Sequence, residues 1–261
     1  MSATFADNAG VRIAYDSSGE GPPLLLMQGI GYARWSWDPV VPALAERFRV
    51  LNFDNRGIGE SDVPPPPYSA RQLAEDGLAV LDDAGVERAH VVGASLGGMA
   101  AQELAAGFSD RVDRLVLACT HPGVEDGYPM PQVTVDLFAQ APTLEPQVAL
   151  RRFVDNALGV APPVGLADEV FAYRLANPPD MNGWLAQAAA GTTFAGVDLA
   201  RIEAPTLVVT GTHDNVIDCR NSELLAERIP NARLERVDGA GHLFFWERSA
   251  EFVRLVEEFL G

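Results

Sequence analysis

The sequence contains no lysine, and all 19 of its basic residues are arginine. Against 36 Asp and Glu residues, these arginines leave a formal net charge of −17 at pH 7. A general nucleic-acid binder, or a protein of anionic membrane surfaces, needs a cationic face that displaces counterions. The charge therefore predicts a protein that binds neither nucleic acid nor membrane.

Cysteine is almost as scarce, since Cys119 and Cys219 are the only two. Two cysteines are too few for a disulfide framework or a zinc cage. Because Cys119 ends an apolar strand, we interpret it as a small core residue. No metal site and no cofactor are predicted.

Long apolar runs are also missing, and the N-terminus lacks the basic start and apolar stretch of a signal peptide. Runs such as Leu24 to Met27 are far too short to cross a bilayer. These absences predict a soluble cytoplasmic protein. With 48% hydrophobic and 21% charged residues over 261 positions, the composition is globular and suits one large α/β domain, with room for an inserted subdomain.

Apolar, β-branched runs alternate with helical patterns along much of the chain, which predicts βαβ units and a mostly parallel, eight-stranded sheet flanked by helices. Strands are expected at residues 3–6, 11–16, 23–27, 50–53, 90–92, 115–118, 206–209 and 233–237. Helices are expected near residues 39–47, 70–84, 95–106, 222–228 and 249–260. The first two strands are expected to form an antiparallel hairpin.

The alternation breaks between His121 and Ala195, where helical patches are separated by the proline pairs Pro162-Pro163 and Pro178-Pro179. We therefore expect a core of residues 1–120 and 196–261, with a mainly helical insertion of residues 121–195 between the sixth and seventh strands. The aromatic residues of the insertion could bound a pocket or pack the insertion onto the core, and the sequence leaves both open.

A candidate nucleophile lies in Gly93-Ala94-Ser95-Leu96-Gly97, which fits the G-x-S-x-G pattern of a nucleophile elbow. The pattern directly follows a predicted strand and opens a predicted helix. Small residues beside the serine allow so tight a turn. The helix N-terminus favours negative charge that develops there. We therefore predict that Ser95 is a nucleophile and not merely a capping residue.

A serine nucleophile needs a base, and four histidines are available. His90 begins the strand that leads to the serine and is expected at the far end of the sheet. His121 and His213 follow strands and are interpreted as rim residues. His242 lies in a glycine-rich loop after the last strand, at the carboxyl edge where open α/β sheets bind ligands, so we predict that His242 is the base.

The third member of a triad is a carboxylate that accepts a hydrogen bond from the imidazole and fixes its tautomer. Asp214 follows the strand at 206–209 and is the predicted acid. Asp218 is the alternative, although it is expected to be the N-cap of the next helix. The chain order Ser95, Asp214, His242 is the order found in α/β-hydrolases.

Together these motifs resemble the α/β-hydrolase superfamily over essentially the whole chain. The segment Asp54 to Ser61 is similar to the D-x-R-G-x-G-x-S turn that follows the fourth strand in many members, and we interpret it as structural. The resemblance implies the α/β-hydrolase fold and makes the insertion a helical cap over the active site. Haloalkane dehalogenases and epoxide hydrolases of this fold have Asp where this chain has Ser95, so acyl transfer to water is expected.

Family members commonly carry His-Gly after the third strand, whereas this chain has Gln28-Gly29. The resemblance places the oxyanion hole at the backbone N–H groups of Ile30 and Leu96. A backbone donor survives the change of His to Gln, so the expected chemistry is unaffected. No metal is expected to take part.

The predicted activity is that of a serine esterase or lactonase that cleaves carboxylic esters or lactones of small to medium, largely apolar substrates through an acyl-enzyme. The sequence is similar to bacterial carboxylesterases and enol-lactonase-like hydrolases. Candidate pocket residues are Trp35, Phe138, Trp184, Leu243 and Phe244. Arg151, Arg152 and Arg174 could bind a substrate carboxylate or lie exposed on the insertion.

Three other activities stay open at this level: a cofactor-free perhydrolase or haloperoxidase, a carbon–carbon bond hydrolase, and a hydrolase homologue that only binds a ligand. The first two share the triad, and the third would use the pocket for recognition. The sequence also leaves open whether the protein is a monomer or a homodimer.

Overall fold

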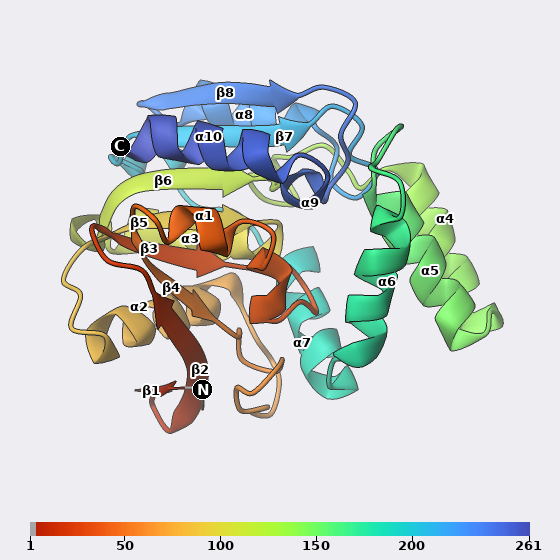
Figure 1. The fold of residues 1–261 in the computed structure, drawn as a ribbon, viewed down its shortest axis with the longest axis horizontal. Helices are drawn as coiled ribbons and strands as arrows, with labels where there is room; N and C mark the ends of the chain where they lie inside the picture. Colours follow the sequence, from red (N-terminus) through yellow and green to blue (C-terminus); the bar gives the residue numbers. More distant parts are fainter. Residues whose placement is uncertain (1–3) are drawn as a thin grey trace.

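In the computed structural model, which describes residues 4–261, eight strands form one mixed sheet in the order β1-β2-β4-β3-β5-β6-β7-β8 (Figure 1). The strands are β1 (Thr4–Asn8), β2 (Val11–Ser18), β3 (Pro23–Met27), β4 (Arg49–Phe53), β5 (Ala89–Ala94), β6 (Val112–Ala118), β7 (Thr206–Gly211) and β8 (Ala232–Val237). β2 pairs antiparallel with β1 and β4, and the other neighbours are parallel. The predicted sheet and hairpin are confirmed; residue 3 lies outside the described residues.

The five helices expected in the core are present, although the one expected near residues 39–47 is a single turn, and four helices occupy the segment where helical patches were expected. They are α1 (Val41–Leu44), α2 (Ala70–Asp83), α3 (Leu96–Gly107), α4 (Gln132–Gln140), α5 (Pro146–Ala157), α6 (Leu166–Ala176), α7 (Met181–Thr192), α8 (Arg220–Arg228), α9 (Phe244–Glu247) and α10 (Ser249–Leu260). Among the described residues, five short elements were not predicted: the helix α9 and the 3₁₀ turns η1 (Arg34–Trp37), η2 (Ser109–Arg111), η3 (Ala141–Thr143) and η4 (Leu199–Arg201). Each spans a single turn, which is too short to leave a hydrophobic period in the sequence.

The parallel strands are buried because helices cover both faces of the sheet (Figure 1). Within β3, Leu24 and Leu26 pack with side chains of α1 and α10, whereas Leu25 and Met27 pack with those of α2 and α3. This alternation follows from the two-residue period of a strand. The sheet therefore has an apolar layer on each of its faces.

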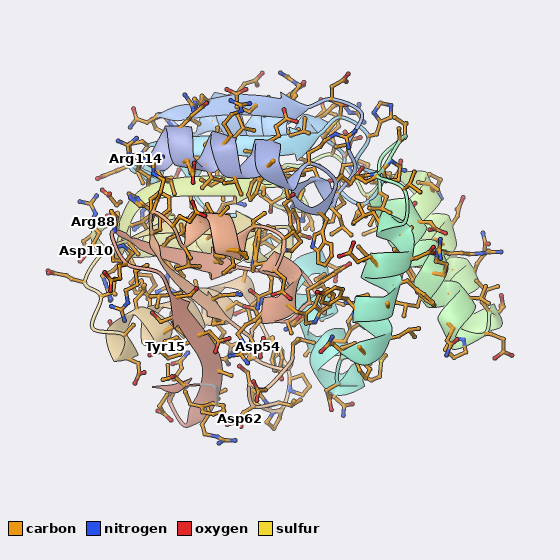
Figure 2. All side chains as sticks on the ribbon, viewed as in Figure 1. Tyr15, Asp54, Asp62, Arg88, Asp110 and Arg114 are labelled. Carbon is orange, nitrogen blue, oxygen red and sulfur yellow. The ribbon has the colours of Figure 1, made fainter. Side chains whose placement is uncertain are left out.

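The turn from Asp54 to Ser61 is held by its own polar groups, as predicted. The carboxylate of Asp54, labelled in Figure 2, accepts hydrogen bonds from the backbone N–H of Arg34 at 2.7 Å and of Glu60 at 2.9 Å. Ser61 Oγ donates to the carbonyl of Asp54 at 2.6 Å. The turn thus fixes the start of η1 beside the end of β4.

Residues 121–195 contain α4, α5, α6 and α7, and these helices lie beyond the carboxyl ends of the parallel strands (Figure 1). The segment is referred to below as the helical insertion. Its division from the core at residues 121 and 195 stays a prediction. Across residues 4–261, no helix combines the length and the apolar character that a membrane crossing requires.

Candidate active site

Ser95 lies at the sharp turn between β5 and α3, with φ 55° and ψ −119°. A positive φ is strained for a residue other than glycine, and such strain persists only where the surroundings enforce it. The backbone N–H of Ser95 donates to the carbonyl of Ala118 at 2.9 Å, and its own carbonyl accepts from Gly98 N at 2.9 Å. Its side chain forms no capping hydrogen bond. The turn therefore presents the hydroxyl without using it to hold the helix.

Glycine is required beside Ser95 because other backbone segments approach very closely. A Cβ at Gly97 would overlap the carbonyl of Met27, and a Cβ at Gly93 would overlap the carbonyl of Gly97. The small residues of the G-x-S-x-G pattern are therefore explained by packing at this turn.

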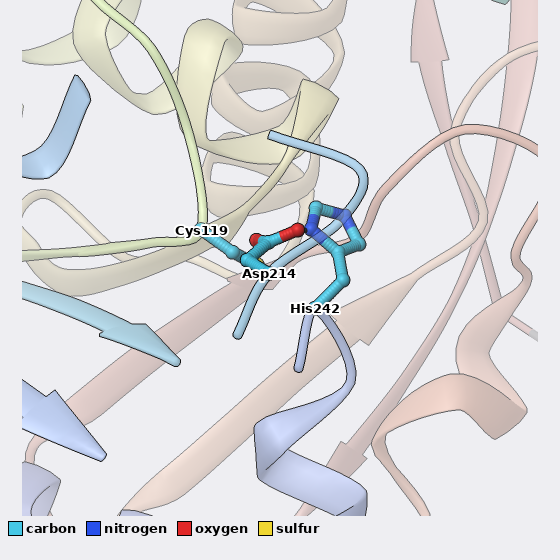
Figure 3. Close-up of side chains that lie close together, drawn as sticks. All are labelled: Cys119, Asp214 and His242. Carbon is cyan, nitrogen blue, oxygen red and sulfur yellow. Dashed lines mark hydrogen bonds and ion pairs between the residues drawn. The ribbon is translucent and has the colours of Figure 1, made fainter. Parts of the chain in front are cut away.

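The structure brings Asp214 and His242 together, as the sequence predicted. Asp214 Oδ2 lies 2.7 Å from His242 Nδ1, and both side chains are buried (Figure 3). The other carboxylate oxygen of Asp214 accepts from the backbone N–H of Val216 at 2.8 Å and of Ile217 at 2.9 Å. Asp218, the alternative acid, forms an ion pair with Arg220 instead. The carboxylate beside His242 is thus held on both of its oxygens.

Opposing effects act on the pKa of His242. Burial lowers the pKa by disfavouring the charged imidazolium. The negative charge of Asp214 and its hydrogen bond outweigh burial, with a contribution from Cys119, and they hold the pKa of His242 well above its ordinary value of 6.5. The imidazolium is therefore strongly stabilised at this position.

The predicted oxyanion donors lie on two segments that meet at Ser95. Leu96 is the first residue of α3, and Ile30 follows Gly29 in the loop after β3. A Cβ at Gly29 would lie 3.2 Å from Ser95 Cβ, so this loop runs directly beside the serine. Within residues 4–261, neither the Ile30 nor the Leu96 N–H donates a hydrogen bond. Both donors are therefore without a partner within the described chain, and Ile30 lines the cavity beside Ser95.

Ser95 and His242 line one cavity of about 980 Å³ between the sheet edge and the helical insertion. Its wall is mostly apolar. Side chains contributed by the insertion include Met130, Val135, Phe138, Leu150, Phe153, Leu175, Met181 and Trp184. A serine, a carboxylate-bound imidazole and a large apolar cavity thus occur together at the carboxyl edge of the sheet.

Residues 22–249 match the alpha/beta hydrolase fold family. The chain belongs to this family. Its mostly parallel, eight-stranded sheet with flanking helices is accordingly that of an α/β-hydrolase.

Known relatives of this α/β-hydrolase act on several kinds of bond. The chain is 32% identical to the putative carbamate hydrolase RutD of Azorhizobium caulinodans, over 92% of this chain and 91% of that protein. It is 31% identical to the poly(3-hydroxyalkanoate) depolymerase of Ectopseudomonas oleovorans, over 97% and 90%. The enol-lactonase of Burkholderia xenovorans LB400 superposes with a TM-score of 0.85 at 30% identity, over 98% and 99%. The protein is a hydrolase of this family.

Cys119 was predicted to be a small core residue, and the structure confirms that it is buried in the core. Its position beside Asp214 and His242 was not predicted. It is 1% exposed, but it also lines the cavity, and its sulfur, an Asp214 oxygen and a His242 ring nitrogen lie within 4.8 Å of one another (Figure 3). Its φ of 42° places it on a strained turn, as at Ser95. The signal that was missed is its position directly after β6, at the carboxyl edge of the sheet.

Cysteine, aspartate and histidine are also the side chains that hold zinc. Here, however, the Nδ1 atom of His242 is already bonded to the Asp214 carboxylate at 2.7 Å. A metal ion at that nitrogen would have to displace this bond. The cluster therefore fits an oriented imidazole better than a metal site.

The other three histidines have separate partners. His90 Nδ1 lies 3.3 Å from Asp113, His121 Nδ1 accepts from Gly123 N at 3.1 Å, and His213 Nδ1 lies 3.2 Å from Thr212 Oγ1. Burial lowers the pKa of both His90 and His121. The expectation of a structural role for His90 is consistent with these contacts.

Two of the five predicted pocket residues do not line the cavity. Phe138, Trp184 and Leu243 do, but Trp35 stacks on Tyr173 with ring centroids 5.4 Å apart, and Phe244 is fully buried. Phe244 faces Phe252 of α10 at 5.5 Å, because α9 directs successive side chains to different sides. Trp37 and Phe245 line the cavity in their place.

Of the three arginines considered as carboxylate ligands, only Arg174 lines the cavity among the described residues. Arg151 is paired with Asp155 and Asp168 at the surface. The Arg174 guanidinium donates to the Gly31 carbonyl and lies 4.5 Å from the centre of the Tyr32 ring. Its donors are therefore partly used within the protein.

Proposed function

We propose that this α/β-hydrolase is a serine esterase or lactonase that acts through an acyl-enzyme at Ser95. The observation that carries the proposal is the convergence in one cavity of an elbow serine with φ 55° and an imidazole bonded to a buried carboxylate. An activated serine needs a base in the same site, and that base needs a third group to orient it.

In the proposed reaction, His242 takes the proton of the Ser95 hydroxyl, and the oxygen forms a bond to the substrate carbonyl carbon. The tetrahedral intermediate collapses as the imidazolium returns the proton to the leaving alcohol, which breaks the ester bond. Water, deprotonated by the same imidazole, then attacks the acyl-enzyme. The bond from the acyl carbon to Ser95 Oγ breaks as the imidazolium returns the proton to that oxygen, and the acid is released. Asp214 holds the ring and stabilises the imidazolium in both halves.

The backbone N–H groups of Ile30 and Leu96 bind the carbonyl oxygen as it gains negative charge. Leu96 N–H also lies at the N-terminus of α3, where the helix dipole favours an anion. Loss of one donor of this kind typically costs about 3 kcal/mol of transition-state stabilisation. The two donors therefore account for a large share of the expected rate enhancement.

The cavity supports a neutral, largely apolar substrate. Its volume of about 980 Å³ is at the upper end of the usual range for small-molecule sites. Among the described lining residues, Arg174 and His242 are the only basic ones and none is acidic. Because Arg174 is bonded to Gly31, the cavity offers little to bind a substrate carboxylate. Esters and lactones with a medium-sized apolar acyl group are the substrates that this wall favours.

The test is labelling with a fluorophosphonate followed by turnover of p-nitrophenyl acetate and butyrate. The label is expected on Ser95, and Ser95→Ala should lose both the label and turnover. Ser36, which also borders the cavity, serves as the control, because Ser36→Ala should keep the label. Wild-type turnover by Ser95→Ala would refute the proposal.

A substrate panel separates the alternatives that share the same serine and histidine. Peracid formation from acetate and hydrogen peroxide would indicate a perhydrolase, and cleavage of vinylogous diketones would indicate a carbon–carbon bond hydrolase. A slow single turnover with tight retention of the product would indicate a ligand-binding homologue. Faster turnover of esters or lactones than of any other class is the expected outcome.

A further inference from the structure

One face of α7 carries small residues and a single glutamine at a spacing of four residues. Gly183, Gln187 and Gly191 lie at successive positions on the same side of the helix, and all three are buried. Figure 1 shows α7 beside the loops at the ends of β3 and β4. This row of the helix therefore consists of backbone and one amide side chain.

The two glycines allow α7 to approach the core very closely. A Cβ at Gly183 would overlap the carbonyl of Gly57, in the turn after β4. A Cβ at Gly191 would lie 3.4 Å from Ile30 Cδ1 and 3.7 Å from Leu96 Cδ1. The C-terminal end of α7 thus packs against the side chains of both proposed oxyanion donors.

Between the glycines, the Gln187 side chain joins two loops of the core. It is 0% exposed, its Oε1 accepts from Gly31 N at 3.0 Å, and its Nε2 donates to Arg56 O at 2.8 Å. Arg56 is held in turn by Asp76 through two hydrogen bonds of 2.6 Å. Gln187 therefore links the loop after β3 to a buried, rigid ion pair.

Gly31 is the residue next to Ile30, and the helical insertion holds both of its backbone polar groups. Its N–H is bonded to Gln187, and its carbonyl accepts from Arg174 of α6. Its φ is +70°, and a Cβ there would lie 2.8 Å from Trp184 Nε1, so the loop has little freedom to move. By contrast, the only hydrogen bond between backbone groups within residues 29–32 is a long one, from Tyr32 N to Gly29 O at 3.4 Å.

We propose that Gln187 is a positioning residue for the oxyanion hole, and that α7 acts as a strut that sets the direction of the Ile30 N–H. The inference rests on the proposed function of Ser95. Oxyanion donors are effective only when they are fixed before the reaction. A displacement of about 1 Å can cost on the order of 100-fold in rate. The helical insertion then has a part in the chemical step besides covering the cavity.

The test compares Gln187→Met with a matched control, Asn221→Leu. Asn221 is also buried, and its amide also makes one acceptor and one donor bond, to the N–H and carbonyl of Tyr128 at 2.7 and 3.1 Å. Each substitution removes two hydrogen bonds while keeping most of the side-chain volume. For Gln187→Met we expect kcat to fall by about 10- to 100-fold with KM near the wild-type value. Both variants should lower Tm by a similar amount. In Asn221→Leu, however, we expect kcat to stay at the wild-type value.

Gln187→Glu provides the conservative rescue. Burial favours the protonated carboxyl, which can accept from Gly31 N and donate to Arg56 O as glutamine does. Its kcat should return toward the wild-type value. If Gln187→Met keeps wild-type kcat, loses activity only through KM, or matches Asn221→Leu in kcat, the inference is overturned.

Amide hydrogen exchange tests the same inference without any substrate. Gln187→Met should raise exchange at residues 29–32, whereas Asn221→Leu should not. If wild-type protein lacks Ser95-dependent turnover, the proposed function fails, and the exchange data still show whether α7 holds the loop. Unchanged exchange at residues 29–32 in Gln187→Met contradicts the positioning role even where the proposed function holds.

Discussion

The carboxylate of Asp214 and the imidazole of His242 lie 2.7 Å apart, although 28 positions separate them in the sequence. The parallel sheet brings them together because the loops after β7 and β8 leave the same edge. The bond fixes the ring through Nδ1, which leaves Nε2 to accept a proton.

Asp214→Asn should lower kcat by about 10⁴-fold, because an amide can no longer hold the required tautomer of the imidazole. Asp218→Asn is the matched control, since Asp218 is paired with Arg220 and is expected to leave turnover unchanged. Steady-state kinetics on p-nitrophenyl butyrate checks both. A larger loss in Asp218→Asn than in Asp214→Asn would show that the acid has been misassigned.

The wild-type kcat/KM should fall as the pH is lowered through the pKa of His242. The protonated ring cannot accept the Ser95 proton, so activity belongs to the neutral form. Because Asp214 holds the pKa of His242 well above 6.5, the acid limb of the profile is expected above pH 6.5. A limb centred below 6.5 would contradict the stabilised imidazolium described above.

Cys119→Ala should move this acid limb to lower pH. The Cys119 side chain contributes to the raised pKa of His242, so its removal lowers that pKa. Cys219→Ala is the control, because Cys219 lies after β7 with its sulfur 3.9 Å from the Thr212 carbonyl. Profiles of kcat/KM against pH for the three proteins provide the measurement. If the acid limb shifts equally in both variants, or in neither, Cys119 does not contribute specifically to the raised pKa of His242.

Asp76→Ala should reduce the free energy of unfolding by about 3 to 5 kcal/mol, since it leaves Arg56 buried without its partner. Asp76 is 0% exposed, and it also accepts a hydrogen bond from Asn8 at 2.8 Å. The neighbouring Glu75 forms an exposed pair with Arg71, so Glu75→Ala should cost no more than about 1 kcal/mol. Urea unfolding of both variants measures the difference.

Ala149→Phe should narrow the range of accepted acyl groups, because Ala149 lines the cavity on α5. Added volume displaces a long chain but leaves room for acetate. We expect the ratio of kcat/KM for p-nitrophenyl octanoate over acetate to fall by about 10-fold or more, as several methylenes lose their contacts. Val148→Phe, at the adjacent exposed position, is the control. An unchanged ratio in Ala149→Phe would place the acyl chain elsewhere.

Much of the fold could be predicted because its signals are local. An apolar run predicts strand β5, and a helical pattern predicts helix α3. The glycines around Ser95 indicate a tight turn in which larger side chains would not fit. The order of Ser95, Asp214 and His242 predicted which loops meet, since parallel strands end at a common edge. Helix α9 was not predicted because a single turn is too short to show the hydrophobic periodicity of a helix.

The sequence by itself determined the sheet and the elbow turn, and it placed Asp214 and His242 in loops at one edge of the sheet. Each of these depends on neighbouring residues or on the position of a loop after a strand. Only the tertiary structure decided which side chains surround them. Gln187 lies 156 positions from Gly31, and no sequence pattern near either residue predicts the hydrogen bond between them. The same is true of Cys119 beside His242. Such contacts depend on how whole helices and loops pack, which is a property of the folded chain and not of any one segment.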